Sequence, residues 1–379
     1  MYASSVVWNP LSNALRRLRG VDGLRDRWRR DLDAAERRLV SRADQALQRT
    51  SERARDAQRA QQARIKQLQL RVEELQRDLT STAERAEDAD RRAHVLEAVI
   101  AHDRRNTAHL SGFLSAVESG ALRDHVTRAL LAAPLIDDPA PMLVVRDLFP
   151  ADVYNAVLEG IPPVGVFTRK DQTKYDFRPR ASAALLSALA EQVWTYLECE
   201  LIPKTMVPAI AARLGPALDA YTRDTFGPVL GEAVGELALE ATSARLMLRK
   251  PGYSLRPHLD PRRVFATGLL YFARPGDDES FGTSFYRVEG QVRRLDTGTY
   301  FPGLNGHPCE FVRKIPFTPN SAVFFVNAAA HGVDIPAAAP PVVERYSLQF
   351  YLGPPVEPLK GLLRGLPEEE RATWAELLA

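Results

Sequence analysis

"SLRPHLDPRR", residues 254–263, places a histidine and an aspartate two positions apart, His258 and Asp260. Side chains two apart on an extended strand point to the same face, so this pair can act on one ion. A lone His-x-Asp pattern also occurs by chance on protein surfaces. The pattern gains meaning only if the chain supplies a third ligand.

The third candidate ligand is His331, in "PNSAVFFVNAAAHGV" (319–333), just past a five-residue apolar run. A ligand that follows a core strand is held by a rigid scaffold and can face the mouth of a barrel. Two imidazoles and one carboxylate on adjacent positions leave other positions open, as in non-haem Fe(II) oxygenases. His307 lies in the Gly/Pro segment "GLNGHPCEF" and is interpreted as a turn residue.

Arg345 opens the apolar segment "RYSLQFYL" after His331. A guanidinium that points inward needs an anion, and a carboxylate can accept two parallel charge-assisted hydrogen bonds from it. Ser347 shares that face and can add a hydroxyl donor. A dicarboxylate co-substrate would supply the anion; the alternative is a salt bridge with Glu344 or Asp334.

Four segments, "KPGYSLRPHLDP", "GLLYFARPG", "PNSAVFFVNAAAHGV" and "RYSLQFYL", together resemble the Fe(II)/2-oxoglutarate-dependent oxygenases, closest to the prolyl-4-hydroxylase-like branch. The resemblance covers residues 140–355 and is sharp over 245–353. It implies that His258, Asp260 and His331 are catalytic and bind Fe(II). It further implies that 2-oxoglutarate is bound by Arg345, Ser347 and Tyr271.

The activity implied by this resemblance is a dioxygenase reaction, in which O2 and 2-oxoglutarate are used to hydroxylate a C–H bond. Related halogenases lack the carboxylate ligand, so Asp260 favours hydroxylation. We expect a small-molecule or sugar-type substrate, and the cluster Arg256, Arg262 and Arg263 suggests an anionic one. Open alternatives are a protein-residue hydroxylase, a non-catalytic coiled-coil scaffold, and a cupin-like protein that uses another metal.

The fold expected for residues 134–358 is α+β. Short apolar runs separated by Gly, Pro and Asp over residues 243–353 predict a barrel or two-sheet sandwich. The resemblance implies a double-stranded β-helix (jelly-roll, cupin-like) with flanking helices. We expect a helical insert at 181–240 and a helical tail at 359–379. The acidic segment "PGDDESFGT" is interpreted as a hairpin tip, with a lid over the substrate as the alternative.

Residues 1–133 are predicted to be helical, with a coiled coil over 65–100. Its apolar seam steps by three and four residues, which predicts a left-handed supercoil. The seam consists of Ile65, Leu68, Val72, Leu75, Leu79, Thr82, Ala86, Ala89, Ala93, Leu96 and Ile100. We expect it to form a homo-oligomer or to bind a partner helix; a single solvated helix is the alternative. The helical-region histidines are interpreted as ordinary helix residues: His94, His102, His109 and His125.

The composition of the 379 residues excludes several classes of protein. A formal charge of +2 with interleaved acids gives no reason to expect nucleic-acid binding. Two cysteines, Cys199 and Cys309, cannot build a disulfide framework or a cysteine zinc cluster, and they fit a reducing compartment. No apolar run approaches the ~20 residues of a membrane span. We therefore expect a cytoplasmic protein.

Overall fold

The computed structural model describes residues 34–35, 61, 64–67, 83–179, 186–242, 244–290 and 298–378. The chain divides into two compact units, Met1–Thr82 and Ala83–Ala379. Residues 68–82 of the predicted coiled coil lie outside the described residues, and its pairing stays a prediction. From Ala83 onward its residues belong to helix α3 (Ala83–Arg105). In the described part of the chain, no helix is long and apolar enough to cross a membrane.

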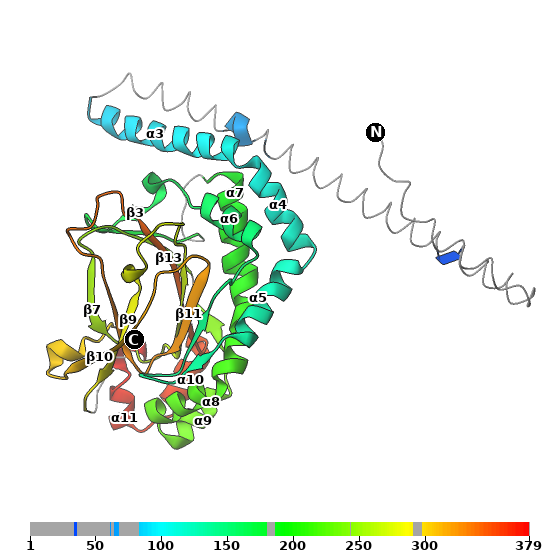
Figure 1. Cartoon of the computed structure of the whole chain (residues 1–379). Helices are drawn as coiled ribbons and strands as arrows, with labels where there is room; N and C mark the ends of the chain where they lie inside the picture. The colour runs from blue at the N-terminus through cyan, green and yellow to red at the C-terminus, as the bar shows by residue number, and fades with distance from the viewer. Residues whose placement is uncertain are drawn as a thin grey trace, which may run out of the picture. The chain divides into compact units, whose positions relative to one another are not determined.

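Two antiparallel sheets form the centre of the second unit (Figure 1). Within the described residues the larger sheet has nine strands, in the order β1-β2-β11-β8-β13-β6-β4-β3, with β5 paired to β13. Its strands are β1 (Leu135–Ile136), β2 (Met142–Val145), β3 (Thr168–Arg169), β4 (Lys174–Phe177), β5 (Glu240–Ala241), β6 (Arg245–Arg249), β8 (Ala266–Tyr271), β11 (Ser321–Val326) and β13 (Arg345–Gly353).

The smaller sheet has the order β10-β9-β12-β7. Its strands are β7 (Ser254–His258), β9 (Thr283–Val288), β10 (Cys309–Ile315) and β12 (Ala330–Asp334). From β6 to β13 the chain passes back and forth between the two sheets, which is the path of a jelly-roll. The predicted α+β class is thereby confirmed. Strands β6 to β13 run from Arg245 to Gly353, and β1–β5, which precede them in the chain, extend the larger sheet.

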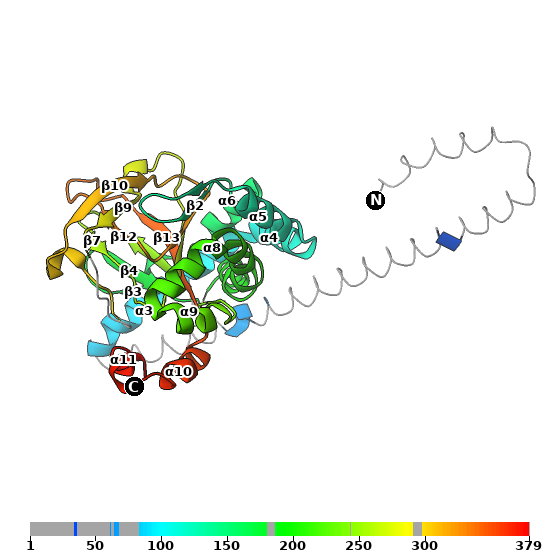
Figure 2. The same cartoon turned by 90° about the horizontal axis from the view of Figure 1, so that it is seen from below.

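Helices cover the outer face of the larger sheet (Figures 1 and 2). They are α4 (Thr107–Glu118), α5 (Ala121–Ala132), α6 (Ala151–Glu159), α7 (Ala188–Tyr196), η2 (Leu197–Met206), α8 (Val207–Phe226) and α9 (Pro228–Gly235). Short single-turn helices are η1 (Val164–Val166), η3 (Glu279–Phe281) and η4 (Pro302–Asn305). The expected domain boundary at 133/134 falls inside the second unit, because α4 and α5 bury Phe113, Leu122 and Val126 in its main core.

Within the second unit, polar contacts join the end of α3 to the α6 and α7 region. The His102 ring lies 2.8 Å from the Ser187 hydroxyl, and the Asp103 carboxylate accepts the Ala188 backbone N–H at 2.7 Å. The Asn106 amide donates to the carbonyl of Glu159 at 3.2 Å. The His102 ring is buried, and this burial lowers its pKa. His102 is a helix residue of α3 with a structural contact to Ser187.

The C-terminal helices pack against α8 and the segment that follows the His-x-Asp motif. They are α10 (Val356–Arg364), α11 (Glu368–Ala372) and α12 (Ala375–Leu378). Trp374 stacks on Phe226 at a ring-centroid distance of 4.8 Å. Arg262 lies over the Trp374 ring at 3.3 Å and donates to the Thr373 carbonyl. Arg262 therefore holds the tail in place.

Candidate metal centre and co-substrate site

The three sequence-predicted metal ligands meet at one end of the smaller sheet. His258 is the last residue of β7, Asp260 follows two positions later, and His331 lies in β12. The antiparallel register pairs His331 directly with His258. His331 therefore lies within a strand of the smaller sheet, five residues after β11 ends in the larger sheet.

The distances within this triad suit a single metal ion. His258 Nε2 lies 3.9 Å from Asp260 Oδ1, and His331 Nε2 lies 3.7 Å from Asp260 Oδ2. Each residue offers one ligand atom, and these atoms lie within 4.8 Å of one another. All three side chains are buried. Buried groups of this kind need a partner, and two imidazoles with one carboxylate form a facial ligand set for a divalent metal.

The protonation of the two rings fits metal binding. The Arg256 carbonyl lies 3.0 Å from His258 Nδ1, so Nδ1 carries the proton and Nε2 is free to bind. Burial, reinforced by the neighbouring His258, lowers the pKa of His331 to about 3, which keeps this imidazole neutral. No described residue hydrogen-bonds to either nitrogen of His331, and Nδ1 is fully buried. An imidazole buried without protein partners is costly unless another group, such as a metal ion, binds it.

The Asp260 carboxylate is held from both sides. Thr267 donates to Oδ2 at 2.6 Å, and Tyr351 donates to Oδ1 at 3.0 Å. The Asp260 backbone N–H donates to Asn327 Oδ1 at 3.2 Å. The Asn327 amide in turn donates to the carbonyls of Asp260, Pro261 and Val264. These bonds fix the carboxylate and the turn that carries it before any metal binds.

Thr267, Asn327 and Tyr351 were missed by sequence reasoning. The signal for Tyr351 is the strict alternation of β13, in which every second residue from Arg345 is polar or carries a hydroxyl. The signal for Thr267 is similar, because it is a threonine within the largely apolar strand β8. Asn327 directly follows the apolar strand before His331, but nothing in its spacing reveals its contacts.

Arg345 lies in the same cavity as the triad and is buried. Its Nε donates to the Phe281 carbonyl at 2.6 Å, and its Nη1 donates to the Ser347 hydroxyl at 3.1 Å. Among the described residues, no carboxylate comes within 4.0 Å of its guanidinium. The alternative salt bridge with Glu344 does not form, because Glu344 faces Lys250 at 3.6 Å and Arg274 at 4.0 Å. Burial lowers the pKa of Arg345, and the neighbouring charge of Arg249 lowers it further.

Ser347 and Tyr271 lie beside Arg345 and are not among the residues that line the cavity. The Tyr271 hydroxyl donates to Thr283 Oγ1 at 2.6 Å, and burial raises the pKa of Tyr271. The Arg345 guanidinium lies 5.3 Å from the centre of the Tyr271 ring. Both residues therefore contact or face Arg345, and their direct contact with a co-substrate stays a prediction.

The cavity around these groups has a volume of about 330 Å³. Its wall from the larger sheet is charged, with Lys174, Arg245 and Arg249 beside Gln349. Arg249 pairs with the buried Asp176 at 2.8 Å. The arginines that were expected to attract an anion lie elsewhere: Arg256, Arg262 and Arg263 do not line this cavity.

Two other sequence interpretations concern loops. In the acidic segment, Asp277 accepts the Arg274 N–H at 2.7 Å and Asp278 accepts the Ser280 N–H at 2.8 Å. Both carboxylates accept backbone hydrogen bonds within the loop, which favours a hairpin tip over a lid that covers the substrate. The His307 ring lies 3.2 Å from the Glu289 carbonyl, as expected of a turn residue.

No protein-family model and no curated protein matches this sequence. Solved structures similar to the chain do include members of the family that the sequence resembles. A 2OG-Fe(II) oxygenase-family oxidoreductase from Burkholderia pseudomallei is 14% identical, with 61% of this chain and 89% of that chain covered and a TM-score of 0.32. A Pseudomonas putida prolyl-4-hydroxylase is 15% identical, with 62% and 100% covered and a TM-score of 0.33.

A third similar structure is HygX from Streptomyces hygroscopicus, solved with nickel and 2-oxoglutarate bound. It is 13% identical, with 56% of this chain and 82% of that chain covered and a TM-score of 0.32.

Proposed function

We propose that this protein is an Fe(II)- and 2-oxoglutarate-dependent dioxygenase that hydroxylates a C–H bond of a small molecule. The observation that carries the proposal is Arg345, a buried guanidinium without a carboxylate partner among the described residues, in the cavity of a His-Asp-His triad. A dicarboxylate that also binds the metal would supply the missing anion. Fe(II) with 2-oxoglutarate, when bound, would supply the activation of O2.

The roles of this chain's residues follow from their contacts. His258, Asp260 and His331 would hold the metal, with Thr267 and Tyr351 fixing the carboxylate. Arg345 would bind the distal carboxylate of 2-oxoglutarate, and Ser347 would orient the guanidinium through their 3.1 Å hydrogen bond. The apolar side chains Leu269 and Phe301 line the same cavity and would keep water from the reacting groups.

Two alternatives have less support. A cupin-like protein with another metal and no 2-oxoglutarate would give Arg345 no anion to bind. A non-catalytic scaffold would have no need of a triad whose carboxylate accepts two hydrogen bonds. A cavity of about 330 Å³ favours a small molecule over a folded protein surface as the substrate.

The test is Fe(II)- and O2-dependent formation of succinate from 2-oxoglutarate. We expect wild-type protein to form succinate and the His331→Ala variant to form none. His307→Ala removes a turn histidine outside the cavity and is the matched control. Succinate formation equal in wild type and His331→Ala would contradict the proposal.

We further propose that residues 65–100 pair with another copy of this chain or with a partner helix. The support is the unbroken three-and-four spacing of the seam. Removing residues 1–82, the first compact unit, should lower the oligomeric state in sedimentation and leave succinate formation intact. An unchanged oligomeric state would contradict pairing through residues 65–82, the part of the segment that is removed.

A further inference from the structure

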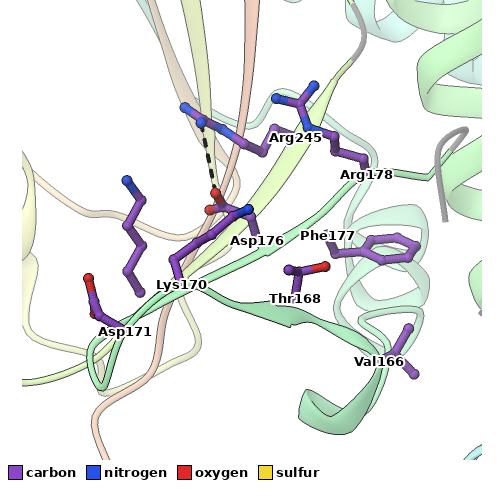
Figure 3. A pocket seen from close by; sticks show the side chains of 9 residues that line it. Val166, Thr168, Lys170, Asp171, Asp176, Phe177, Arg178 and Arg245 are labelled. Atoms are coloured by element: carbon purple, nitrogen blue, oxygen red, sulfur yellow. Dashed lines mark ion pairs between the residues drawn. The ribbon is translucent and has the colours of Figure 1, made fainter.

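A second pocket has a volume of about 510 Å³ (Figure 3). It adjoins the metal cavity, the space of about 330 Å³ that the His-Asp-His triad and Arg345 line. Lys174 and Arg245 line both spaces, so the two are neighbours. The pocket lies along β4 and the start of β6, the strands next to the metal cavity in the larger sheet. A small molecule with its reacting carbon near the triad could place a second group here.

The pocket has more positive than negative charge. Its lining includes four cations, Lys170, Lys174, Arg178 and Arg245, and two carboxylates, Asp171 and Asp176. The Asp176 carboxylate is shared: Arg249 pairs with it at 2.8 Å from behind the pocket, and Arg245 lies 3.8 Å from it. One carboxylate thus faces two arginines.

The second carboxylate, Asp171, is engaged in its own turn. It accepts the Thr173 N–H at 2.7 Å and the Thr173 hydroxyl at 3.0 Å, and these bonds lower its pKa. No carboxylate in the described part of the chain lies within 4.0 Å of Lys170 or Arg178. Figure 3 shows Arg178 and Arg245 extending to the same side of the pocket, with Arg245 turned toward Asp176.

Like charges gathered in one pocket repel one another unless an anion lies between them. We propose that this pocket binds a phosphate group carried by the substrate while the substrate's reacting carbon lies in the metal cavity. A phosphate dianion matches a surplus of two positive charges, and arginine binds its oxygens through paired N–H groups. The substrate role of the pocket rests on the proposed dioxygenase function, whereas phosphate binding itself does not.

The test is calorimetric titration of the full-length, metal-free protein with inorganic phosphate at low ionic strength, with acetate as the comparison anion. Wild type should bind phosphate saturably and more tightly than acetate. The double variant Lys170→Gln/Arg178→Gln, which changes exposed side chains, should bind phosphate about tenfold more weakly, because two charged donors are lost. Arg256→Gln, an exposed arginine outside both spaces, is the matched control, and Arg345→Gln excludes phosphate bound at the co-substrate arginine; both should bind phosphate as wild type does.

The inference is overturned if the double variant binds phosphate as tightly as wild type, if Arg345→Gln abolishes binding, or if acetate binds as tightly as phosphate. Because the titration needs no metal, its outcome is independent of succinate formation. If the protein forms succinate but does not bind phosphate, only the phosphate inference is wrong. If the protein binds phosphate but forms no succinate, the substrate role of the pocket and the proposed function are both wrong.

Discussion

Strand β13 is largely buried on both faces, and the two faces are chemically opposite. Outward, Tyr346, Leu348, Phe350 and Leu352 join the main apolar core under the helices. Inward, the strand presents a different set: Arg345, Ser347, Gln349 and Tyr351. A strand buried on both sides by packing alone would be a continuous apolar run. The inner face is therefore kept polar at a cost in stability, which implies that ligands bind there.

Neighbouring strands extend the same contrast. On β6 the residues Leu246 and Leu248 enter the main core, whereas Arg245 and Arg249 line the metal cavity. On β8 the ring of Phe350 packs so closely over Gly268 that an added Cβ would lie 2.7 Å from it. Inner-face changes should therefore affect binding, and outer-face changes should affect folding.

The largest effect is expected for His331→Ala. Loss of a direct ligand should weaken Fe(II) binding at least about 100-fold, since even outer contacts to a metal ligand are worth 10- to 100-fold. Anaerobic Fe(II) titration measures this loss, with His307→Ala as the control. Retained Fe(II) affinity would show that the triad is not the metal site.

The reverse behaviour is expected for Leu348→Ala on the outer face. Leu348 is 1% exposed, and its truncation should lower the free energy of unfolding by about 2–5 kcal/mol. Denaturant unfolding measures the change. The folded variant should bind Fe(II) as wild type does; a loss of metal affinity with unchanged stability would break the contrast between the faces.

Arg345→Gln should act on the co-substrate. Loss of a charge-assisted pair should weaken 2-oxoglutarate binding about 10- to 100-fold and leave Fe(II) binding unchanged. Ser347→Ala removes only the 3.1 Å contact to Arg345 and should have a smaller effect. Anaerobic calorimetry with 2-oxoglutarate measures both. If Arg345→Gln destabilises the fold without changing 2-oxoglutarate affinity, the arginine is structural.

The smallest effect is expected for Tyr351→Phe, which removes the 3.0 Å hydrogen bond to Asp260 and little else. Fe(II) affinity should fall about tenfold. Tyr346→Phe is a matched control on the same strand, because its hydroxyl donates outward to Glu344 at 2.9 Å. Equal Fe(II) affinities for the two variants would mean that Tyr351 does not tune the metal ligand.

The ligand set could be predicted from the sequence because each member marks a strand or its end. His258 and Asp260 are two apart, His331 follows an apolar run, and Arg345 is a charge at the start of another. The strand pairing that brings His331 opposite His258 joins residues 73 apart in the chain, and the sequence did not predict it.

The charged pocket could not be predicted, because its residues come from distant segments. Arg178 and Lys174 precede the helical region, and Arg245 follows it. In the sequence they are isolated cations, whereas Arg256, Arg262 and Arg263 form a visible cluster. Because those three arginines are close in the chain, the sequence suggested that they attract an anionic substrate. In the structure, the pairing of β4 with β6 brings Lys174, Arg178 and Arg245 together instead.

The most direct test is an anaerobic titration of the metal-free protein with Fe(II) and then 2-oxoglutarate, followed by visible absorption. If the proposed dioxygenase function is correct, a charge-transfer band appears only when Fe(II) and 2-oxoglutarate are both present. The band is absent in His331→Ala, and Arg345→Gln needs a higher 2-oxoglutarate concentration to develop it. A folded protein that binds Fe(II) but develops no band with 2-oxoglutarate would contradict the proposed dioxygenase function.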